Sequence, residues 1–406
     1  MTGASSRQRL LAVLFVVLLA IAVTACGSSD SSSSESTGAD TTASTAGGEG
    51  GGQTEVSEES GGESSAGVKA AEEEVEELRN EITEFTPPGP EFDASAAKGG
   101  TVWYIPVSAE IPVLAIESKG MEEAAKAAGM SYKTCDGKFT PAAQSACITQ
   151  AVNSGAAGII TDSVDPKSVG PALSAAKSAE IPVVGFNSIG EESDLYRTVN
   201  SGDPESQVGA MNWIIAESGG EASVLGVYFV GDSQTEAGAK AGIEALEKNC
   251  PECSYESATV TSEQINQIPS AVSSALLKTP DVNYGIPQFD FFAPLFERGV
   301  QQAGKTNDIQ TVSTNAALSQ MKVVASGGMQ KADVGANRNY VGWESIDALL
   351  RMIAGEPAAE NLTYPVRVFD ETNIGDLELN ETAAADGSWF GPTVYKQEFP
   401  KLWGLG

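Results

Sequence analysis

The chain of 406 residues contains no histidine, so the most frequent general base and metal ligand in proteins is absent. A triad of nucleophile, histidine and acid is excluded for the same reason. Catalysis would have to rest on carboxylates or lysine, and no spacing in the sequence indicates such a site. We therefore predict no catalytic residue, no metal site and no cofactor.

Short polar side chains recur directly after the predicted strands. Because ligands of parallel α/β sheets bind beyond the carboxyl ends of the strands, the residues at these positions form the predicted ligand site. Asp, Ser and Asn after a strand also cap helices, so capping stays open as an alternative for each of them. The predicted site residues are Ser108, Glu110, Asp136, Ser163, Asn187 and Ser188 in the first half, and Asp232, Phe289, Asp290 and Asn315 in the second.

The elements that position these residues alternate between strands and helices. The first half predicts strands at 101–107, 131–135, 158–161 and 181–186, with helices at 114–128, 141–154 and 167–179. The second half repeats the order, with strands at 222–230, 254–260, 282–287 and 309–313 and helices at 235–248, 265–277 and 293–303, followed by a helix at 341–354 and a strand at 364–369. Alternation with strands that are apolar throughout predicts parallel sheets covered on both faces. The predicted fold class is α/β, with two similar doubly wound parallel-sheet lobes joined by a multi-strand hinge.

The N-terminus predicts export. Arg7 and Arg9 precede an apolar run at 10–23, which is shorter than the roughly 20 residues of a membrane-spanning helix and ends in small residues, as a cleaved signal does. A short anchor helix is the alternative. The tetrapeptide Val-Thr-Ala-Cys at 23–26 resembles a lipobox, the bacterial lipoprotein signal, which implies that Cys26 is lipidated and that residues 1–26 are a signal peptide.

Residues 27–67 consist mainly of Ser, Gly, Thr and Glu, which predicts a disordered tether. Apolar residues spaced three and four apart from Val68 to Phe85 predict an amphipathic helix that ends at Pro87-Pro88, so 68–98 form a helix and linker. We expect this helix to pack on a lobe surface; a coiled-coil contact with a partner is the alternative.

Four cysteines remain once Cys26 is lipidated. An even number in an oxidising compartment favours disulfides, and we predict the pairs Cys135–Cys147 and Cys250–Cys253. The motif at 250–253 could also be a zinc or redox site. Zinc would need a second ligand pair, and a redox motif would open a helix after a strand, whereas this one follows a predicted helix.

The formal net charge of −31 excludes nucleic acid as a partner, because no basic stripe interrupts the negative field. Residues 27–97 hold 17 acidic and 2 basic residues, so roughly half of the net charge belongs to the N-terminal arm. The acidity is therefore weak evidence about the ligand.

Five segments in order resemble those of the type I periplasmic-binding-protein fold, in its sugar-binding branch and actinobacterial lipoprotein form, similar to ribose-binding proteins. They are GTVWYIP at 100–106, IPVVGFN at 181–187, IPQFD at 286–290, GWESID at 342–347 and KLWG at 401–404. The resemblance implies an extracytoplasmic, lipid-anchored monomer that captures one small molecule for an ABC permease in the membrane. It further implies a hinge at 199–204 and 335–339, a first lobe of 99–201 plus 337–365, and a second lobe of 202–336 plus 366–406.

The resemblance also implies roles for single residues, several of which depart from the family pattern. Asn187 and Ser188 stand where the family usually has aspartate and arginine, and Phe289 stands where ribose binders have asparagine. Asp290 matches the family, Asn315 replaces an aspartate, and Ala336 replaces a glutamine. Val113 and Leu114 occupy the places of two aromatic rings that stack on a sugar. These departures predict a ligand that is less polar or less hydroxylated than a simple sugar.

Two other functions stay open at this point. The same capture fold can serve a sensory receptor instead of a transporter, and the sequence does not separate the two. The chain could also be an exported enzyme that uses carboxylates such as Asp290 and Glu110.

Overall fold

The computed structural model describes residues 59–406 except 232, 360, 361, 363 and 365, and all of these belong to one compact unit, Val56–Gly406. The predicted signal peptide, the lipidation site Cys26, the tether up to residue 58 and the site residue Asp232 lie outside the described residues. In the described part of the chain, no helix combines the length and the apolar content that a membrane crossing requires.

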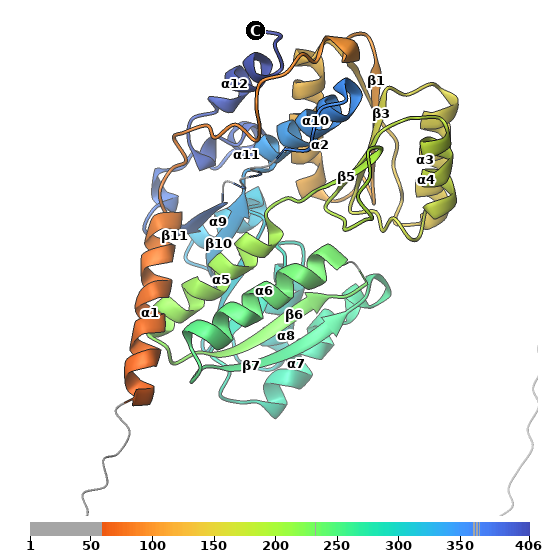
Figure 1. Cartoon of the computed structure of the whole chain (residues 1–406). Coiled ribbons are helices and arrows are strands. Elements are labelled where there is room, and N and C mark those ends of the chain that lie inside the picture. The colour runs from red at the N-terminus through yellow and green to blue at the C-terminus, as the bar shows by residue number, and fades with distance from the viewer. Residues whose placement is uncertain (1–58, 232, 360–361, 363, 365) are drawn as a thin grey trace, which may run out of the picture. The chain divides into compact units, whose positions relative to one another are not determined.

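The first sheet contains β1 (Thr101–Pro106), β2 (Ser131–Thr134), β3 (Gly158–Asp162), β4 (Val183–Phe186) and β5 (Tyr196–Val199). The order is β2-β1-β3-β4-β5, and every pairing is parallel (Figure 1). The helices α2 (Pro112–Ala127) and α10 (Arg338–Ala354) cover one face, and α3 (Pro141–Asn153) and α4 (Gly170–Ser178) cover the other. We call this layered body the first lobe. Its strands β3 and β4 are buried over their whole length, which explains their apolar sequences.

The second sheet contains β6 (Ser223–Phe229), β7 (Ser254–Val260), β8 (Tyr284–Pro287), β9 (Gln310–Thr314), β10 (Gln330–Ala336) and β11 (Val366–Asp370). The order is β11-β10-β9-β8-β6-β7, parallel except for the antiparallel pair of β10 and β11. The helices α5 (Asp203–Ser218) and α6 (Ser233–Asn249) lie on one face, α7 (Ile268–Lys278) and α8 (Ala293–Gln302) lie on the other, and α9 (Leu318–Ala325) packs beside β10. We call this body the second lobe.

The predicted α/β class with two doubly wound sheets is confirmed, and the predicted strands and helices of both halves are present within a few residues of their expected ends. The prediction missed β5, α5, α9, β10 and two short helices near the C-terminus, α11 (Glu381–Asp386) and α12 (Tyr395–Leu402). The pattern of α5 is hidden because it buries polar residues, among them Gln207 and Asn212, and β10 likewise buries Gln330 and Asp333.

The chain passes between the lobes along three segments. The first joins β5 to α5 at 199–203, the second joins β10 to α10 at 336–338, and the third runs from the end of α10 to the start of β11. The predicted hinge segments 199–204 and 335–339 fall on the first two of these connections.

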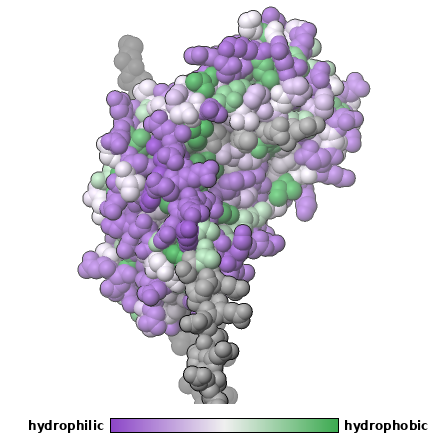
Figure 2. All heavy atoms as spheres, turned by 60° about the vertical axis from the view of Figure 1, so that its left-hand side comes forward, coloured by the Kyte–Doolittle hydropathy of each residue, from purple (hydrophilic) through white to green (hydrophobic). Residues whose placement is uncertain are grey.

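The N-terminal helix α1 (Glu59–Leu78) packs on α5 and α6 of the second lobe, through the buried side chains of Ala71 and Val75. It begins earlier than predicted, within the expected tether, and at Gly67 it lies too close to the backbone of Asn249, at the end of α6, for a larger residue to fit. Figure 2 shows hydrophilic side chains along the outer face of this region.

The predicted helix across 68–85 is wrong beyond Leu78, because the following residues are held by tertiary contacts. Arg79 forms a salt bridge with Asp370 on β11, with 2.6 Å between Nη2 and Oδ2. Further along, the ring of Phe92 lies 4.4 Å from the guanidinium carbon of Arg351 on α10. The segment 79–97 therefore contacts both lobes.

The C-terminal residues return to the first lobe. The helix α12 packs on α10, and the indole of Trp403 stacks on that of Trp343 with 5.8 Å between ring centroids. The indole nitrogen of Trp403 donates a hydrogen bond of 2.8 Å to Asp347. The predicted assignment of 366–406 to the second lobe therefore describes β11 and not α12.

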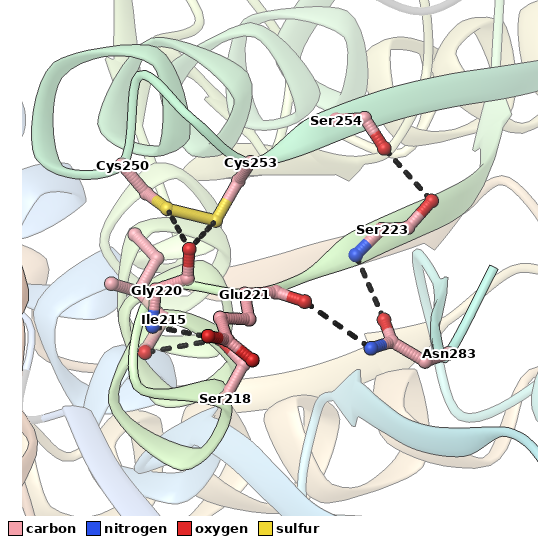
Figure 3. The surroundings of a disulfide bond; sticks show 9 residues. All are labelled: Ile215, Ser218, Gly220, Glu221, Ser223, Cys250, Cys253, Ser254 and Asn283. Carbon is pink, nitrogen blue, oxygen red and sulfur yellow. Dashed lines mark hydrogen bonds between the residues drawn. A yellow bond between two sulfur atoms is a disulfide. The ribbon is translucent and has the colours of Figure 1, made fainter. Parts of the chain in front are cut away.

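Both predicted disulfides are present, between Cys135 and Cys147 and between Cys250 and Cys253. The second lies between the end of α6 and the start of β7, and its two sulfur atoms are 3.3 and 3.5 Å from the carbonyl oxygen of Gly220 (Figure 3). The motif therefore closes a turn at the amino ends of the strands, away from the predicted ligand site.

Candidate functional site

A buried carboxylate organises the strand ends of the first lobe. Asp162, the last residue of β3, accepts hydrogen bonds from the Tyr104 hydroxyl (2.5 Å), the Ser163 hydroxyl (3.1 Å) and the Asn187 amide nitrogen (3.1 Å). Ser163 and Asn187 are predicted site residues, and both have backbones in the left-handed region, with φ of 55° and 52°. Their side chains thus meet on one acid at the carboxyl edge of the sheet.

The Glu117 carboxyl, on the buried face of α2, lies next to this group. Burial and then the negative charge of Asp162 raise the pKa of Glu117 well above its usual range. Burial also raises the pKa of Asp162, although its hydrogen bonds oppose the shift. The Oε2 atom of Glu117 has no donor among the described residues, as expected when two acceptors face each other. Each of these two neighbouring buried carboxyl groups is therefore harder to ionise than an exposed one.

The strand ends of the second lobe hold a similar acid pair. Asp290 accepts hydrogen bonds from the Ser313 hydroxyl and from the backbone nitrogen of Ala317 (2.6 Å). Asp333 on β10 accepts from the backbone nitrogen of Ala316 (2.9 Å). Burial raises the pKa of Asp290 to about 6 and that of Asp333 well above its usual range. Asp290 therefore holds the turn at 315–317 in place from inside the lobe.

One buried cation connects the two groups. The guanidinium of Arg338, at the start of α10, binds Glu117 through Nη1 (3.0 Å), and Asp203 at the start of α5 through Nη2 (2.9 Å). The same Nη2 donates a hydrogen bond of 2.5 Å to the side chain of Asn315. Glu117 belongs to the first lobe, whereas Asp203 and Asn315 belong to the second. Arg338 therefore connects α2 of the first lobe with the start of α5 and the end of β9 in the second.

The positive charge of Arg338 is neutralised by the carboxylates of Asp203 and Glu117. Burial lowers the pKa of this arginine, and the charges of Asp203 and Glu117 more than offset that effect. The cation also sits in the first turn of α10, where the helix dipole disfavours positive charge, so the two acids are required to hold it there. Among the described residues of this network, Arg338 therefore offers no unpaired charge to a ligand.

Besides Oε2 of Glu117, several other buried polar atoms lack a hydrogen-bond partner in the described part of the chain. They include Oδ1 of Asn187, Oγ of Ser188, Nε of Arg338 and Nε2 of Gln234, which lies in the first turn of α6. An unpaired buried polar atom costs about 1–3 kcal/mol, so such atoms normally bind water or a ligand. Together these atoms offer both acceptors and donors to a bound molecule.

The other predicted site residues differ in how deeply they are buried and in the hydrogen bonds that they form. Ser108 is buried and accepts a hydrogen bond from the backbone of Glu110, which is itself exposed, and Asp136 accepts from the backbones of Ala109 and Lys138. Ser188 and Leu114 are buried, Val113 is half-buried, and Phe289 packs beside Phe292 with 5.8 Å between ring centroids.

Sequence reasoning missed Glu117, Asp162, Asp203, Gln234 and Arg338. One signal was available for Glu117, which interrupts the apolar stripe of Leu114, Met121 and Ala124 on α2. Asp162 was missed because the predicted strand ended one residue too early. The role of Arg338 depends on partners more than 130 residues away in sequence, which no local pattern reveals.

Two cavities lie away from the strand ends. One of about 150 Å³ is bordered by the segment after α1 and by Tyr340, Tyr364 and Tyr395. The other lies between α1 and the start of α5, and glutamates form part of its border.

Comparison with known proteins places these features in a family. Residues 102–357 match the model of the periplasmic binding protein domain family. Among curated proteins, no sequence matches the chain.

Several solved structures share the fold at low sequence identity. The solute-binding protein of a 5-methylthioribose transporter from Thermotoga lettingae TMO, solved with 5-methylthioribose, is 17% identical, with a TM-score of 0.63 over 78% of this chain and 100% of that one. A protein from Mycobacterium smegmatis in complex with β-D-fucofuranose is 20% identical, with a TM-score of 0.60 over 72% and 98% of the chains. An ABC transporter solute-binding protein from Agrobacterium vitis with bound allitol is 15% identical, with a TM-score of 0.59 over 69% and 98%.

Replacing Arg338 with alanine should destabilise the protein by about 3–5 kcal/mol, because Glu117 and Asp203 would be left buried without their cation. The free energy of unfolding in urea, followed by tryptophan fluorescence, measures the change. The matched control is Arg298→Ala on α8, where the arginine is exposed, and its effect should stay within about 0.5 kcal/mol. Equal effects of the two substitutions would contradict the proposed role of Arg338.

Asp290→Asn should change how stability depends on pH. The folded-state pKa of Asp290, about 6, lies above the usual value of 3.8, so its contribution is present below about pH 4 and is lost as the pH rises through 6. The variant lacks this titration, so its stability should fall less than that of the wild type between pH 4.5 and 7. Urea unfolding at both pH values tests this, and parallel losses would refute it.

Proposed function

The chain belongs to the periplasmic binding protein domain family, and we propose that it is a solute-binding protein that captures one small hydroxylated molecule between its two lobes. The bound form would then deliver the molecule to the permease of an ABC importer. The observation that carries the proposal is the contact of Arg338 with both lobes, together with buried polar atoms, such as Oδ1 of Asn187, that have no partner among the described residues.

The chemistry of these side chains favours a neutral ligand. The only cation among them is paired with two acids, and the carboxyl pairs of both lobes have raised pKa values because they are buried. Amide and guanidinium atoms can instead bind hydroxyl groups, which both donate and accept hydrogen bonds. The ligands bound by the three structural neighbours, 5-methylthioribose, β-D-fucofuranose and allitol, support this class.

Capture would follow from a shift between open and closed arrangements of the lobes. A ligand that contacts both lobes binds the closed arrangement better and favours it by that difference in affinity. The connections at 199–203 and 336–338 are short, and we propose that they absorb the backbone rotation. The lobes themselves would then move as rigid bodies.

We propose that the protein acts outside the cytoplasm, held on the membrane by a lipid on Cys26. The support is the lipobox-like sequence at 23–26, which precedes a Ser- and Gly-rich stretch. Cys26→Ser in the producing bacterium should abolish incorporation of a labelled fatty-acid analogue into the protein. Labelling of this variant at the level of the wild type would show that Cys26 is not the site of lipid attachment.

A thermal-shift panel with the purified full chain tests the capture of a hydroxylated molecule. Pentoses, hexoses, polyols and nucleosides form the panel, with amino acids and dicarboxylates as charged controls. A ligand present at 100 times its dissociation constant adds about 2.7 kcal/mol of stability. We expect at least one hydroxylated compound, and no charged control, to raise the melting temperature. Turnover of the bound compound would instead indicate an enzyme.

For the compound that binds, Asn187→Ala should raise the dissociation constant by about tenfold or more, because a buried hydrogen bond to the ligand is lost. Calorimetric titration measures the change. Asn283→Ala is the matched control: this asparagine contacts Ser223 and Glu221 at the opposite, amino-terminal edge of the second sheet (Figure 3). It should affect stability and leave the affinity unchanged. Equal affinity losses in both variants would contradict the placement of the site.

A further inference from the structure

We propose that the ligand combines a hydroxylated part with one apolar substituent, as an aryl glycoside does. This inference rests on the proposed function and narrows it to a class of ligand. The observation behind it is the position of large hydrophobic side chains that are exposed. Among the described residues these are Phe139, Ile189, Leu277 and Phe291, with exposed fractions of 49%, 48%, 72% and 54%.

Three of the four follow the carboxyl ends of strands. Phe139 lies in the loop after β2, Ile189 comes three residues after the end of β4, and Phe291 comes four residues after the end of β8. Leu277 lies instead near the end of α7. Three of the four exposed apolar residues thus follow the carboxyl edges of the two sheets, after β2 and β4 in the first lobe and after β8 in the second.

The loop that carries Phe139 is held in a fixed, unusual conformation. Lys138 and Phe139 both have left-handed backbones, with φ of 50° and 55°, which non-glycine residues adopt only when surrounding contacts enforce it. Asp136 supplies one contact by accepting from the backbone of Lys138 (3.0 Å), and the backbone nitrogen of Phe139 donates to Val107 (2.8 Å). The exposed ring is therefore presented by an ordered turn.

The other two residues adjoin groups already assigned to the site. Ile189 comes two positions after Asn187, whose Oδ1 atom lacks a partner. Phe291 comes directly after Asp290 and is part of an aromatic row, since its ring lies 6.0 Å from that of Phe292, which in turn lies 5.8 Å from Phe289. At the ends of β4 and β8, an exposed apolar residue thus follows a polar residue of the site within two positions in the sequence.

This arrangement identifies the kind of molecule that both sets of atoms can bind. A bound partner that covers an exposed ring gains the free energy of burying its apolar surface. Exposed apolar patches on soluble proteins therefore often mark binding sites. A simple sugar would use the polar atoms and leave the rings exposed. A hydrocarbon would leave Oδ1 of Asn187, Nε2 of Gln234 and Nε of Arg338 without the partners that they lack among the described residues. A hydroxylated molecule with an aryl or alkyl substituent satisfies both.

Calorimetric titration of the full chain with matched glycosides tests the inference. The probes are the phenyl and methyl β-glycosides of glucose, galactose and ribose. For at least one sugar, the phenyl compound should bind about tenfold or more tightly than the methyl compound, because its ring contacts the exposed side chains. Equal affinity of the two would overturn the inference and leave the proposed function standing. Absence of binding by every glycoside would overturn the inference alone, because the proposed function is tested by the wider panel of sugars, polyols and nucleosides.

Substitutions of the two exposed phenylalanines test whether the tighter binding of the phenyl glycoside depends on the strand-end loops. Phe139→Asn, which tolerates the left-handed backbone, and Phe291→Asn should each weaken binding of the phenyl glycoside about tenfold, with less than about a twofold effect on the methyl glycoside. The matched control Leu277→Asn should change neither, and melting temperatures show that each variant is folded. Unchanged affinities in both phenylalanine variants would show that these rings serve another surface and would overturn the inference.

Discussion

A buried guanidinium must be neutralised by partners within reach, and in this protein that constraint joins the two lobes. Arg338 lies at the start of α10 and binds Glu117 of the first lobe together with Asp203 and Asn315 of the second. Since Asp162 adds a further acid beside Glu117, the carboxyl groups outnumber the cation, and burial raises the pKa of both acids. The centre of the molecule is therefore polar with little net charge, which suits hydroxyl groups better than ions.

The same network bears on how the lobes move. Glu117 lies on α2, which packs against α10, so its ion pair with Arg338 stays within the first lobe, whereas the contacts to Asp203 and Asn315 cross the connections at 199–203 and 336–338. Any rotation about these connections must keep or replace the crossing contacts, since a buried charge without a partner is costly. In the proposed mechanism the ligand also affects the relative free energy of the open and closed arrangements of the lobes. Its hydroxyl groups would bind atoms such as Nε of Arg338 and Oδ1 of Asn187, which have no partner in the described part of the chain.

The sequence was sufficient for the fold and insufficient for the centre of the site. Strands such as β3 and β4 carry continuous apolar runs that are easily recognised, and the strand-end rule led to Asn187 and Ser163. In contrast, α5 and β10 carry buried polar residues such as Gln207 and Asp333, which interrupt the apolar period, and both elements were missed. Arg338 could not be found because its significance comes from Glu117, 221 positions away, and Asp203, 135 positions away. Polar residues buried for function are thus the ones that hydrophobic patterns conceal.

The central claim is that a small molecule is held by the strand ends of both lobes at once. Hydrogen–deuterium exchange of the full chain tests it most directly, with the compound of the thermal-shift panel that gives the largest stabilisation. The account predicts slower exchange at 107–111 and 187–190 of the first lobe, and at 288–292 and 315–317 of the second, with no change at the amino-terminal edges at 155–157 and 279–283. Protection confined to one lobe, or centred on the amino-terminal edges, would contradict it.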